Sequence, residues 1–150
     1  MNILFRVDGF PKAQPRAKAR VFAGHAAVYD PGTAKGWKEL VREAALPFRP
    51  ETPLEGPVLV TIVWFLPRPQ SLCRKRDPEG PVLCWKRPDR DNLDKAVLDV
   101  LTNMGMFRDD AQVCRGEPAK YYHSKAGRPG TVVEIRQLSG DEPPPLPETL

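Results

Sequence analysis

The chain has 150 residues, of which 41% are hydrophobic and 28% charged, as expected for one globular domain without a membrane-spanning segment. Its formal net charge is +4 and becomes +7 when the three acids of segment 139–150 are left out, which favours a polyanionic partner such as nucleic acid. Three cysteines without a CxxC pair and two histidines in glycine-flanked polar stretches argue against a disulfide framework, a zinc site or a nucleophile–histidine pair.

The N-terminal residues predict a strand followed by a basic segment. Residues 3–10 alternate between two faces in strand fashion, and the first six lack the order of a signal peptide, so we expect a cytoplasmic protein. Residues 10–20 hold two prolines, four basic residues and no acid, which excludes a continuous helix. The segment is either a solvated loop or an arm along a phosphate backbone, with candidate DNA contacts at Lys12, Arg16, Lys18 and Arg20.

A helix and a buried strand follow this segment. The turn residues Asp30-Pro31-Gly32 precede a predicted helix from Ala34 to about Leu46, which two prolines end. Residues 58–66 form a nearly continuous apolar run that is rich in β-branched and aromatic side chains. Such a run predicts a central strand that is buried on both faces.

The segment 67–88 differs in composition, because it holds five prolines and six basic residues. A connection of this length in a small domain is usually functional or disordered. We expect a short helical turn over 71–76 and a short strand over 82–85. The second group of candidate DNA-binding side chains lies here: Arg74, Lys75, Arg76, Lys86 and Arg87.

The clearest predicted helix covers residues 91–104, where apolar side chains form one unbroken stripe that Gly105 ends. Two strands are expected after it, over about 111–123 and 131–138. The order βαβαββ predicts an α+β fold, with a small mixed β-sheet covered by two helices. This domain spans residues 1–138, and the proline-rich acidic segment 139–150 is predicted to be a disordered tail.

Two aspartates at the start of this helix indicate a metal site. Asp89 and Asp91 are two residues apart in an extended approach to the helix, so both carboxylates can point the same way. Carboxylates side by side repel unless a cation lies between them, and hard oxygen ligands suit Mg²⁺ or Mn²⁺. Lys95 lies one helical turn past Asp91 and can reach the same site. The alternative, acids that only stabilise a helix N-terminus, is the commoner case for such a segment alone.

The other acids of the same region differ in whether they can belong to this metal site. Asp94 belongs to the first helical turn, and Asp99 can pair with the lysine one turn before it, so we assign both to the helix itself. Asp109 and Asp110 follow the far end of the helix, about 20 Å from its start. They can join the first two aspartates only if the chain turns back at Gly105 and runs beside the helix as a strand.

The two acidic segments together resemble the signature of RusA-type Holliday-junction resolvases. The first runs from Pro88 to Asp99 as Pro-Asp-Arg-Asp-Asn-Leu-Asp-Lys-Ala-Val-Leu-Asp, and the second from Asp109 to Val113 as Asp-Asp-Ala-Gln-Val. That family pairs a D-x-D-N-x-x-K helix start with a D-D-x-Q-[VI] strand start. The resemblance covers most of residues 5–138, and the two-part acidic motif is highly specific.

The resemblance implies an activity and a site. It implies a homodimer that cuts four-way DNA junctions with Mg²⁺, in recombination and repair, with no membrane and no nucleotide cofactor; many members are encoded by phages or prophages. The two departures from the pattern, the acid at Asp94 and the pair Cys84-Trp85, leave the chemistry intact and put the sequence preference in doubt. The implied site consists of Asp89, Asp91 and Asp110 as catalytic metal-binding carboxylates, Lys95 as a catalytic lysine that neutralises charge or positions water, and Asp109 and Asn92 as supporting residues.

Two other functions are compatible with the residues alone. One is a module that binds branched DNA without cutting it, and the other is a metal nuclease that acts on flaps or RNA. The full set of acids argues against binding alone, because carboxylates near phosphates only weaken the attraction between protein and nucleic acid. The resemblance, rather than any single residue, favours a junction over other branched substrates.

Overall fold

The structure is a computed structural model that describes residues 1–145 of the chain. Part of the tail predicted over 139–150 therefore lies outside the described residues, and its disorder stays a prediction. Among the residues described, no helix has the length and apolarity needed to cross a membrane. The elements are β1 (Asn2–Asp8), β2 (Lys18–Phe22), β3 (His25–Tyr29), α1 (Lys35–Ala45), η1 (Leu46–Phe48), β4 (Val58–Leu66), η2 (Gln70–Leu72), β5 (Val82–Leu83), α2 (Arg90–Asn103), η3 (Asp110–Gln112), β6 (Val113–Arg115), β7 (Ala119–Tyr122) and β8 (Gly130–Gln137).

A six-stranded mixed sheet confirms the predicted α+β fold. Its order is β1-β8-β4-β7-β5, and β6 pairs with the first residues of β4. β8 is antiparallel to both β1 and β4, whereas β6 and β7 run parallel to β4. The predicted strands and helices occur in the predicted order. The structure adds the hairpin β2–β3, limits the short strand expected over 82–85 to β5, and divides the strand expected over 111–123 into β6 and β7.

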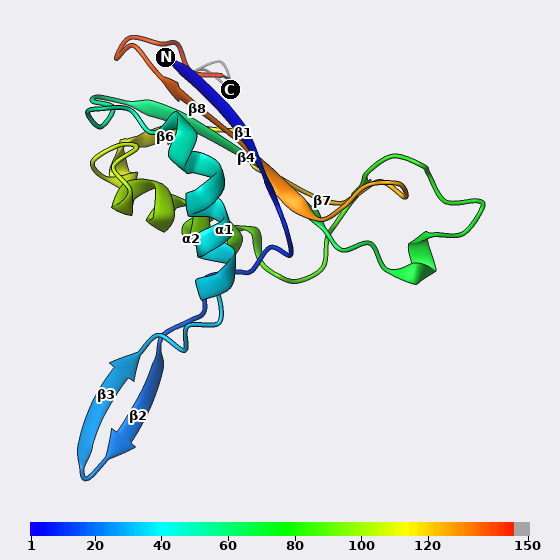
Figure 1. The fold of residues 1–150 in the computed structure, drawn as a ribbon, viewed down its shortest axis with the longest axis horizontal. Helices are drawn as coiled ribbons and strands as arrows, with labels where there is room; N and C mark the ends of the chain where they lie inside the picture. The colour runs from blue at the N-terminus through cyan, green and yellow to red at the C-terminus, as the bar shows by residue number, and fades with distance from the viewer. Residues whose placement is uncertain (146–150) are drawn as a thin grey trace.

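Both helices pack on one face of the sheet (Figure 1). Trp64 of β4 lies against Trp37 of α1, with ring centroids 6.1 Å apart, and it also donates a hydrogen bond to Asp94 of α2. Alternate residues of β4 from Val58 to Leu66 are buried, and the residues between them are only half-buried. The prediction that this strand is buried on both faces is therefore wrong for one face, because both helices of the described chain cover the other.

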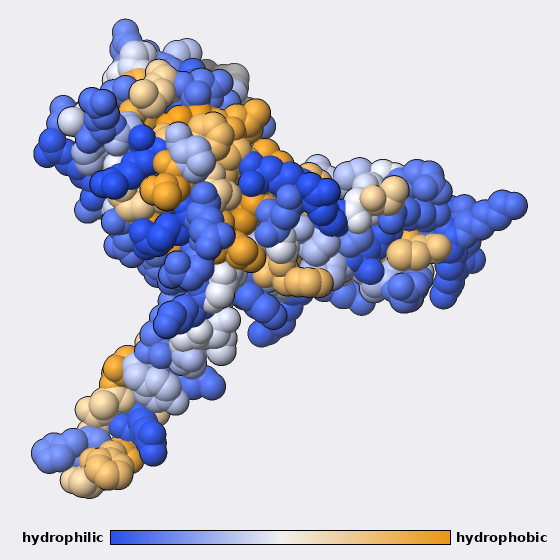
Figure 2. Space-filling view, viewed as in Figure 1, coloured by the Kyte–Doolittle hydropathy of each residue, from blue (hydrophilic) through white to orange (hydrophobic). Residues whose placement is uncertain are grey.

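β2 and β3 form a hairpin that projects from the body of the protein (Figure 1). Ala23 and Gly24 both have positive φ, as in the two-residue turns that match the twist of antiparallel strands. All residues of the two strands are exposed, and apolar side chains lie on the hairpin surface (Figure 2). Residues 18–20 of the basic segment, which the sequence left as either a loop or an arm, thus belong to a strand.

The proline-rich connection 67–88 is organised around one buried arginine. The guanidinium of Arg68 donates hydrogen bonds to the carbonyl oxygens of Leu72 at 2.9 Å, Pro78 at 2.7 Å and Gly80 at 2.8 Å. These contacts draw the connection into a loop that extends to one side of the sheet (Figure 1). Arg68 is therefore a structural residue, whereas the neighbouring cations of the loop are exposed.

Candidate functional site

Asp89 and Asp91 lie at the start of α2, as predicted. Asp89 is the residue before the first helical turn and has an extended backbone, yet its carboxylate accepts no hydrogen bond from that turn. Asp91 lies in the turn itself. Both side chains are exposed, and neither makes a hydrogen bond or an ion pair with any described residue. The capping alternative therefore does not account for Asp89, and both carboxylates face solvent without a partner.

The other two acids of α2 are engaged within the fold. Asp94 accepts a hydrogen bond from Nε1 of Trp64 at 2.7 Å, and burial raises the pKa of its carboxyl despite this bond and the nearby Arg90. Asp99 forms the predicted pair with Lys95 at 3.4 Å. These contacts agree with the assignment of Asp94 and Asp99 to the helix rather than to a reaction.

Lys95 does not contact Asp91 in this arrangement. Its Nζ atom lies beside Asp99, one turn further along the helix, and the side chain is largely exposed. The predicted approach of Lys95 to the carboxylate pair is thus not formed within the chain. A long exposed side chain can change rotamer at low cost, so its catalytic role stays a prediction.

Asp109 and Asp110 differ sharply in what they contact. The carboxylate of Asp109 accepts a hydrogen bond from the backbone N–H of Ala111 at 2.8 Å, while the side chain of Gln112 accepts one from the N–H of Asp109 at 3.0 Å. This reciprocal pair forms a capping box around η3. The amide of Gln112 also donates to the carbonyl oxygen of Leu54 at 3.0 Å. Asp109 therefore supports the turn, and Asp110 is left exposed without a partner among the described residues.

Asp110 lies at the opposite end of α2 from Asp89 and Asp91. The chain does run back beside the helix after η3, as predicted, but the residue that reaches the helix start is Pro118, whose carbonyl oxygen accepts from Arg90. The 14 residues of α2 span about 20 Å. Accordingly, no group of three His, Cys, Asp or Glu side chains among residues 1–145 is arranged to hold a metal ion. Asp89 and Asp91 lie two residues apart at the start of α2, and Asp110 lies elsewhere.

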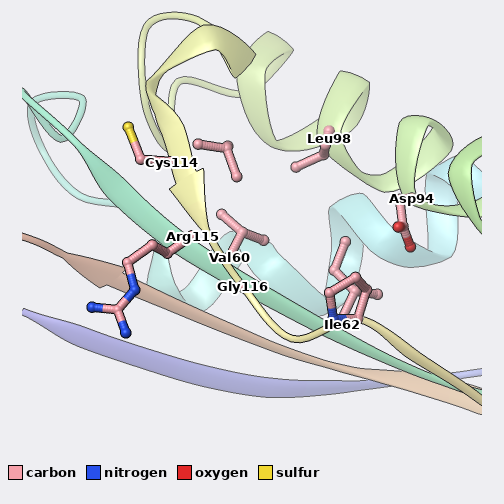
Figure 3. Close-up of a pocket in the computed structure, with 9 residues that line it drawn as sticks. Val60, Ile62, Asp94, Leu98, Cys114, Arg115 and Gly116 are labelled. Carbon is pink, nitrogen blue, oxygen red and sulfur yellow. The ribbon is translucent and has the colours of Figure 1, made fainter. Parts of the chain in front are cut away.

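A groove lies between α2 and β6 (Figure 3). Its volume is about 260 Å³, and its walls are mainly aliphatic, with Val60, Ile62 and Leu98 among them. The carboxylate of Asp94 lies at one end, and the side chain of Arg115 points away from it, toward the sheet (Figure 3). Because only Asp94 brings a charge to its interior, this groove lacks the groups that phosphodiester hydrolysis needs.

A second groove joins Asp89 to two arginines from different segments. It has a volume of about 570 Å³ and is lined by Ala13, Arg16, Arg87, Pro88, Asp89 and Asn92. The backbone N–H of Gln14 donates to the carbonyl oxygen of Asn92 at 2.8 Å, which fixes the N-terminal basic segment against the start of α2. Asn92 thus has a supporting contact through its backbone. The result is a surface where a phosphate can lie between cations and carboxylates.

The predicted DNA-binding cations are all exposed, and most of them lie in one of three regions: the groove beside Asp89, the hairpin and the loop around Arg68. Arg16 and Arg87 line the groove beside Asp89. Lys18 and Arg20 belong to the hairpin, and the cluster of residues 74–76 lies on the loop that Arg68 organises. The remaining two, Lys12 and Lys86, flank the groove in sequence.

Two residues near Asp89 were missed by sequence reasoning as parts of the site. Nζ of Lys120 in β7 donates to the carbonyl oxygens of Lys86 and of Pro88, the latter at 2.7 Å, and so fixes the approach to Asp89. No sequence signal marks Lys120, because the contact joins residues more than thirty positions apart. Trp85 is 84% exposed on the same segment. It was noted only as a departure from a family pattern.

Comparison with known proteins relates most of the chain, rather than single residues, to a known family. Residues 8–136 match the protein family described as endodeoxyribonuclease RusA. The chain is also similar to the uncharacterized protein YqaN of Bacillus subtilis (strain 168), with 32% identity over 142 residues that cover 91% of this chain and 97% of YqaN. The family match includes both acidic segments, the basic groove and the hairpin.

Proposed function

The chain belongs to the RusA family of endodeoxyribonucleases, a family of Holliday-junction resolvases, and we propose that it cuts four-way DNA junctions with Mg²⁺ during recombination and repair. The observation that carries this proposal is that only some of the acids in the two motif segments have partners in the fold. Asp89, Asp91 and Asp110 are the acids of the two motif segments without a partner among the described residues, whereas Asp94, Asp99 and Asp109 are engaged in the fold. Unpaired carboxylates beside a basic groove suit a metal nuclease.

The residues of the chain divide the work of hydrolysis between binding and chemistry. Arg16 and Arg87 hold the backbone phosphate beside Asp89, an interaction that gives affinity without sequence information. Mg²⁺, or Mn²⁺ in its place, supplies an activated water and charge relief when the carboxylates bind it. Lys95, whose side chain is exposed, turns toward the phosphate and neutralises developing charge.

The separation of the carboxylates within one chain points to two copies in the active protein. Asp110 of a second copy can complete the pair formed by Asp89 and Asp91, because it is exposed and unpaired at the other end of α2. A four-way junction also requires two symmetric cuts, and a two-fold homodimer supplies two sites related by the symmetry of the substrate. We therefore propose a homodimer in which each site takes residues from both chains.

Two rival functions make different predictions about substrates. A protein that only binds branched DNA has no use for unpartnered carboxylates beside its phosphate groove, where Asp89 lies. A metal nuclease for flaps or RNA shares all the chemistry described above and differs only in the shape that it recognises. The experiment is cleavage of end-labelled four-way, Y-shaped and linear DNA and of a matched RNA duplex, with Mg²⁺ and with EDTA.

The expected result is a pair of symmetric cuts in the four-way junction that requires Mg²⁺. Binding without any cut would support the binding module instead. Faster cleavage of the Y-shaped DNA or of the RNA than of the junction would assign the site to another substrate. A cut in EDTA at the rate seen with Mg²⁺ would remove the metal from the proposal.

A further inference from the structure

Trp85 is the most exposed large apolar side chain in the described part of the protein, with 84% of its surface accessible. The other two tryptophans, Trp37 and Trp64, are 3% and 0% exposed and belong to the core. Exposure of so large an aromatic ring is costly in water, because a buried ring removes a large apolar area from solvent. A ring in this position is open to contact with a binding partner.

The segment that carries Trp85 is held firmly, so the ring is presented outward rather than frayed. Cys84 is buried, and its backbone N–H donates to the carbonyl oxygen of Lys120 at 2.9 Å. The ammonium of Lys120 in turn holds the carbonyl oxygens of Lys86 and Pro88. Trp85 is thus flanked on both sides by residues tied to β7, and its own side chain is exposed.

The position of Trp85 links it to the phosphate groove. It lies four residues before Asp89, so the two Cα atoms are at most about 14 Å apart. The Nζ atom of Lys86 lies 5.8 Å from the centre of the Trp85 ring, and Arg87 lines the groove beside Asp89. The aromatic ring of Trp85, the cations of Lys86 and Arg87 and the carboxylate of Asp89 therefore lie within five consecutive residues.

We propose that Trp85 stacks on a base face that is left open at the branch point of the DNA, next to the phosphate that is cut. This inference rests on the proposed function, since it names the part of the substrate that the same site recognises. The cations beside the ring match the phosphates on either side of such a base, and stacking on aromatic side chains tolerates any base. A base within a duplex has both faces covered by its neighbours, whereas the branch point offers open ones.

The consequence is a rule for where the enzyme cuts. A base held by Trp85 places the branch point at a fixed offset from Asp89, so the ring sets the distance between the branch and the cut. Stacking of one base is expected to contribute about 5- to 150-fold in affinity for the junction. Binding to a fully paired duplex gains nothing from the ring.

The tryptophans themselves provide the first test. The emission of Trp85 is the part that acrylamide quenches, because the rings of Trp37 and Trp64 are buried. In EDTA, where the DNA stays uncut, a four-way junction should reduce this emission and protect it from acrylamide. A paired duplex of the same length should do so much less. Equal changes with junction and duplex, or no change with a junction that binds, would overturn the proposal.

Variants of Trp85 provide the second test, with 2-aminopurine placed at the branch point as a reporter of stacking. Trp85→Ala should weaken junction binding about 5- to 150-fold, leave duplex binding unchanged and scatter the cut positions, whereas Trp85→Phe should keep most of the affinity. The matched control is Leu83→Ala, which removes a nearby exposed apolar side chain, 64% accessible, that has no aromatic ring. Trp85→Ala with wild-type affinity and wild-type cut positions would contradict the proposal.

The outcomes also separate this inference from the proposed function. If the wild-type protein neither binds nor cuts a four-way junction, the proposed function itself is wrong. A protein that cuts the junction while the emission of Trp85 stays constant would leave that function standing and reject only the stacking. If the Trp85 ring instead binds a second copy or another protein, that partner would shift the emission of Trp85 in the absence of DNA. Such a shift would also reject the stacking.

Discussion

The carboxylates of Asp89 and Asp91 are the groups on which the proposed chemistry depends. Asp89→Asn and Asp91→Asn should each abolish cleavage, because an amide is a poorer ligand for Mg²⁺. Junction binding should persist or tighten, since each change removes a negative charge beside the phosphate. Cleavage and gel-shift assays on the same labelled junction measure both effects.

The matched control for these variants is Asp141→Asn, which neutralises an exposed acid outside the two motif segments. This variant should cleave like wild type. Full activity of either Asp89→Asn or Asp91→Asn would remove that residue from the site.

Asp94 gives a prediction about the pH dependence of stability. Burial raises the pKa of its carboxyl above 3.8 in the folded chain, so ionisation of Asp94 opposes folding. The penalty is absent below the unfolded value and grows as the pH rises from 3.8 to the raised folded value. Asp94→Asn keeps an acceptor for Trp64 and loses the charge, so its unfolding free energy should rise relative to wild type over this window.

Urea unfolding between about pH 4 and pH 7 measures this difference. The control is Asp94→Ala, which also loses the charge but leaves the indole N–H of Trp64 unsatisfied, so it should be about 1–3 kcal/mol less stable than Asp94→Asn at every pH. A constant difference between Asp94→Asn and wild type across the whole range would show that burial does not shift the Asp94 carboxyl.

At the level of single residues, the sequence identified the acidic segments, but the residue patterns alone could not show which aspartates support the fold and which are left for the site. Asp109 and Asp110 have the same side chain, and only the capping box with Gln112 shows that Asp109 holds the turn while Asp110 has no partner within residues 1–145. The family resemblance had assigned the roles in the same way. The fixing of the Asp89 segment by Lys120 could not be foreseen, because it depends on the pairing of β5 with β7.

The hairpin β2–β3 is the element whose role can be tested with least disturbance. Its strand residues are all exposed, so replacing residues 18–29 by a short glycine–serine linker should leave the melting temperature unchanged. The same replacement removes Lys18 and Arg20. Junction binding should weaken, and the slope of log affinity against log salt should fall by about one unit per lost phosphate contact.

Fluorescence anisotropy with a labelled junction at several salt concentrations measures that slope. A variant in which only Lys18 and Arg20 become glutamine, with the strands kept, serves as the control for the loss of charge. An unchanged slope in both variants would show that the hairpin does not contact the DNA phosphates.

At the scale of elements, the sequence predicted what local patterns determine. The apolar run of β4 and the stripe of α2 were predicted to within a residue or two of their observed bounds. The division of 111–123 into β6 and β7 was not, because it arises from contact between distant segments. At Gly116 a Cβ atom would lie 2.0 Å from the carbonyl oxygen of Val60, so the chain passes β4 there without room for a side chain. The hairpin was missed because the prolines before it suggested irregular chain.

The uncovered face of the sheet is relevant to the proposed dimer. Residues of β4 between the buried ones are half-buried, and Leu4 of β1 is exposed on the same sheet. A second copy could cover such a surface, as closed two-fold assemblies do. Light scattering near micromolar concentration should therefore give about twice the chain mass of 16.8 kDa. A mass that stays at the single-chain value under these conditions, in a preparation that makes paired cuts, would contradict the dimer.

The central claim is that one cutting site takes Asp89 and Asp91 from one chain and Asp110 from another. Asp91→Asn and Asp110→Asn should each be inactive alone. When the two inactive proteins are mixed and exchange chains, each mixed dimer has one site with all three aspartates and one site that lacks two of them. Cleavage of a labelled four-way junction by the mixture, as single nicks, is the predicted result. If chain exchange is verified with differently tagged proteins and the mixture stays as inactive as its parts, the shared site is wrong.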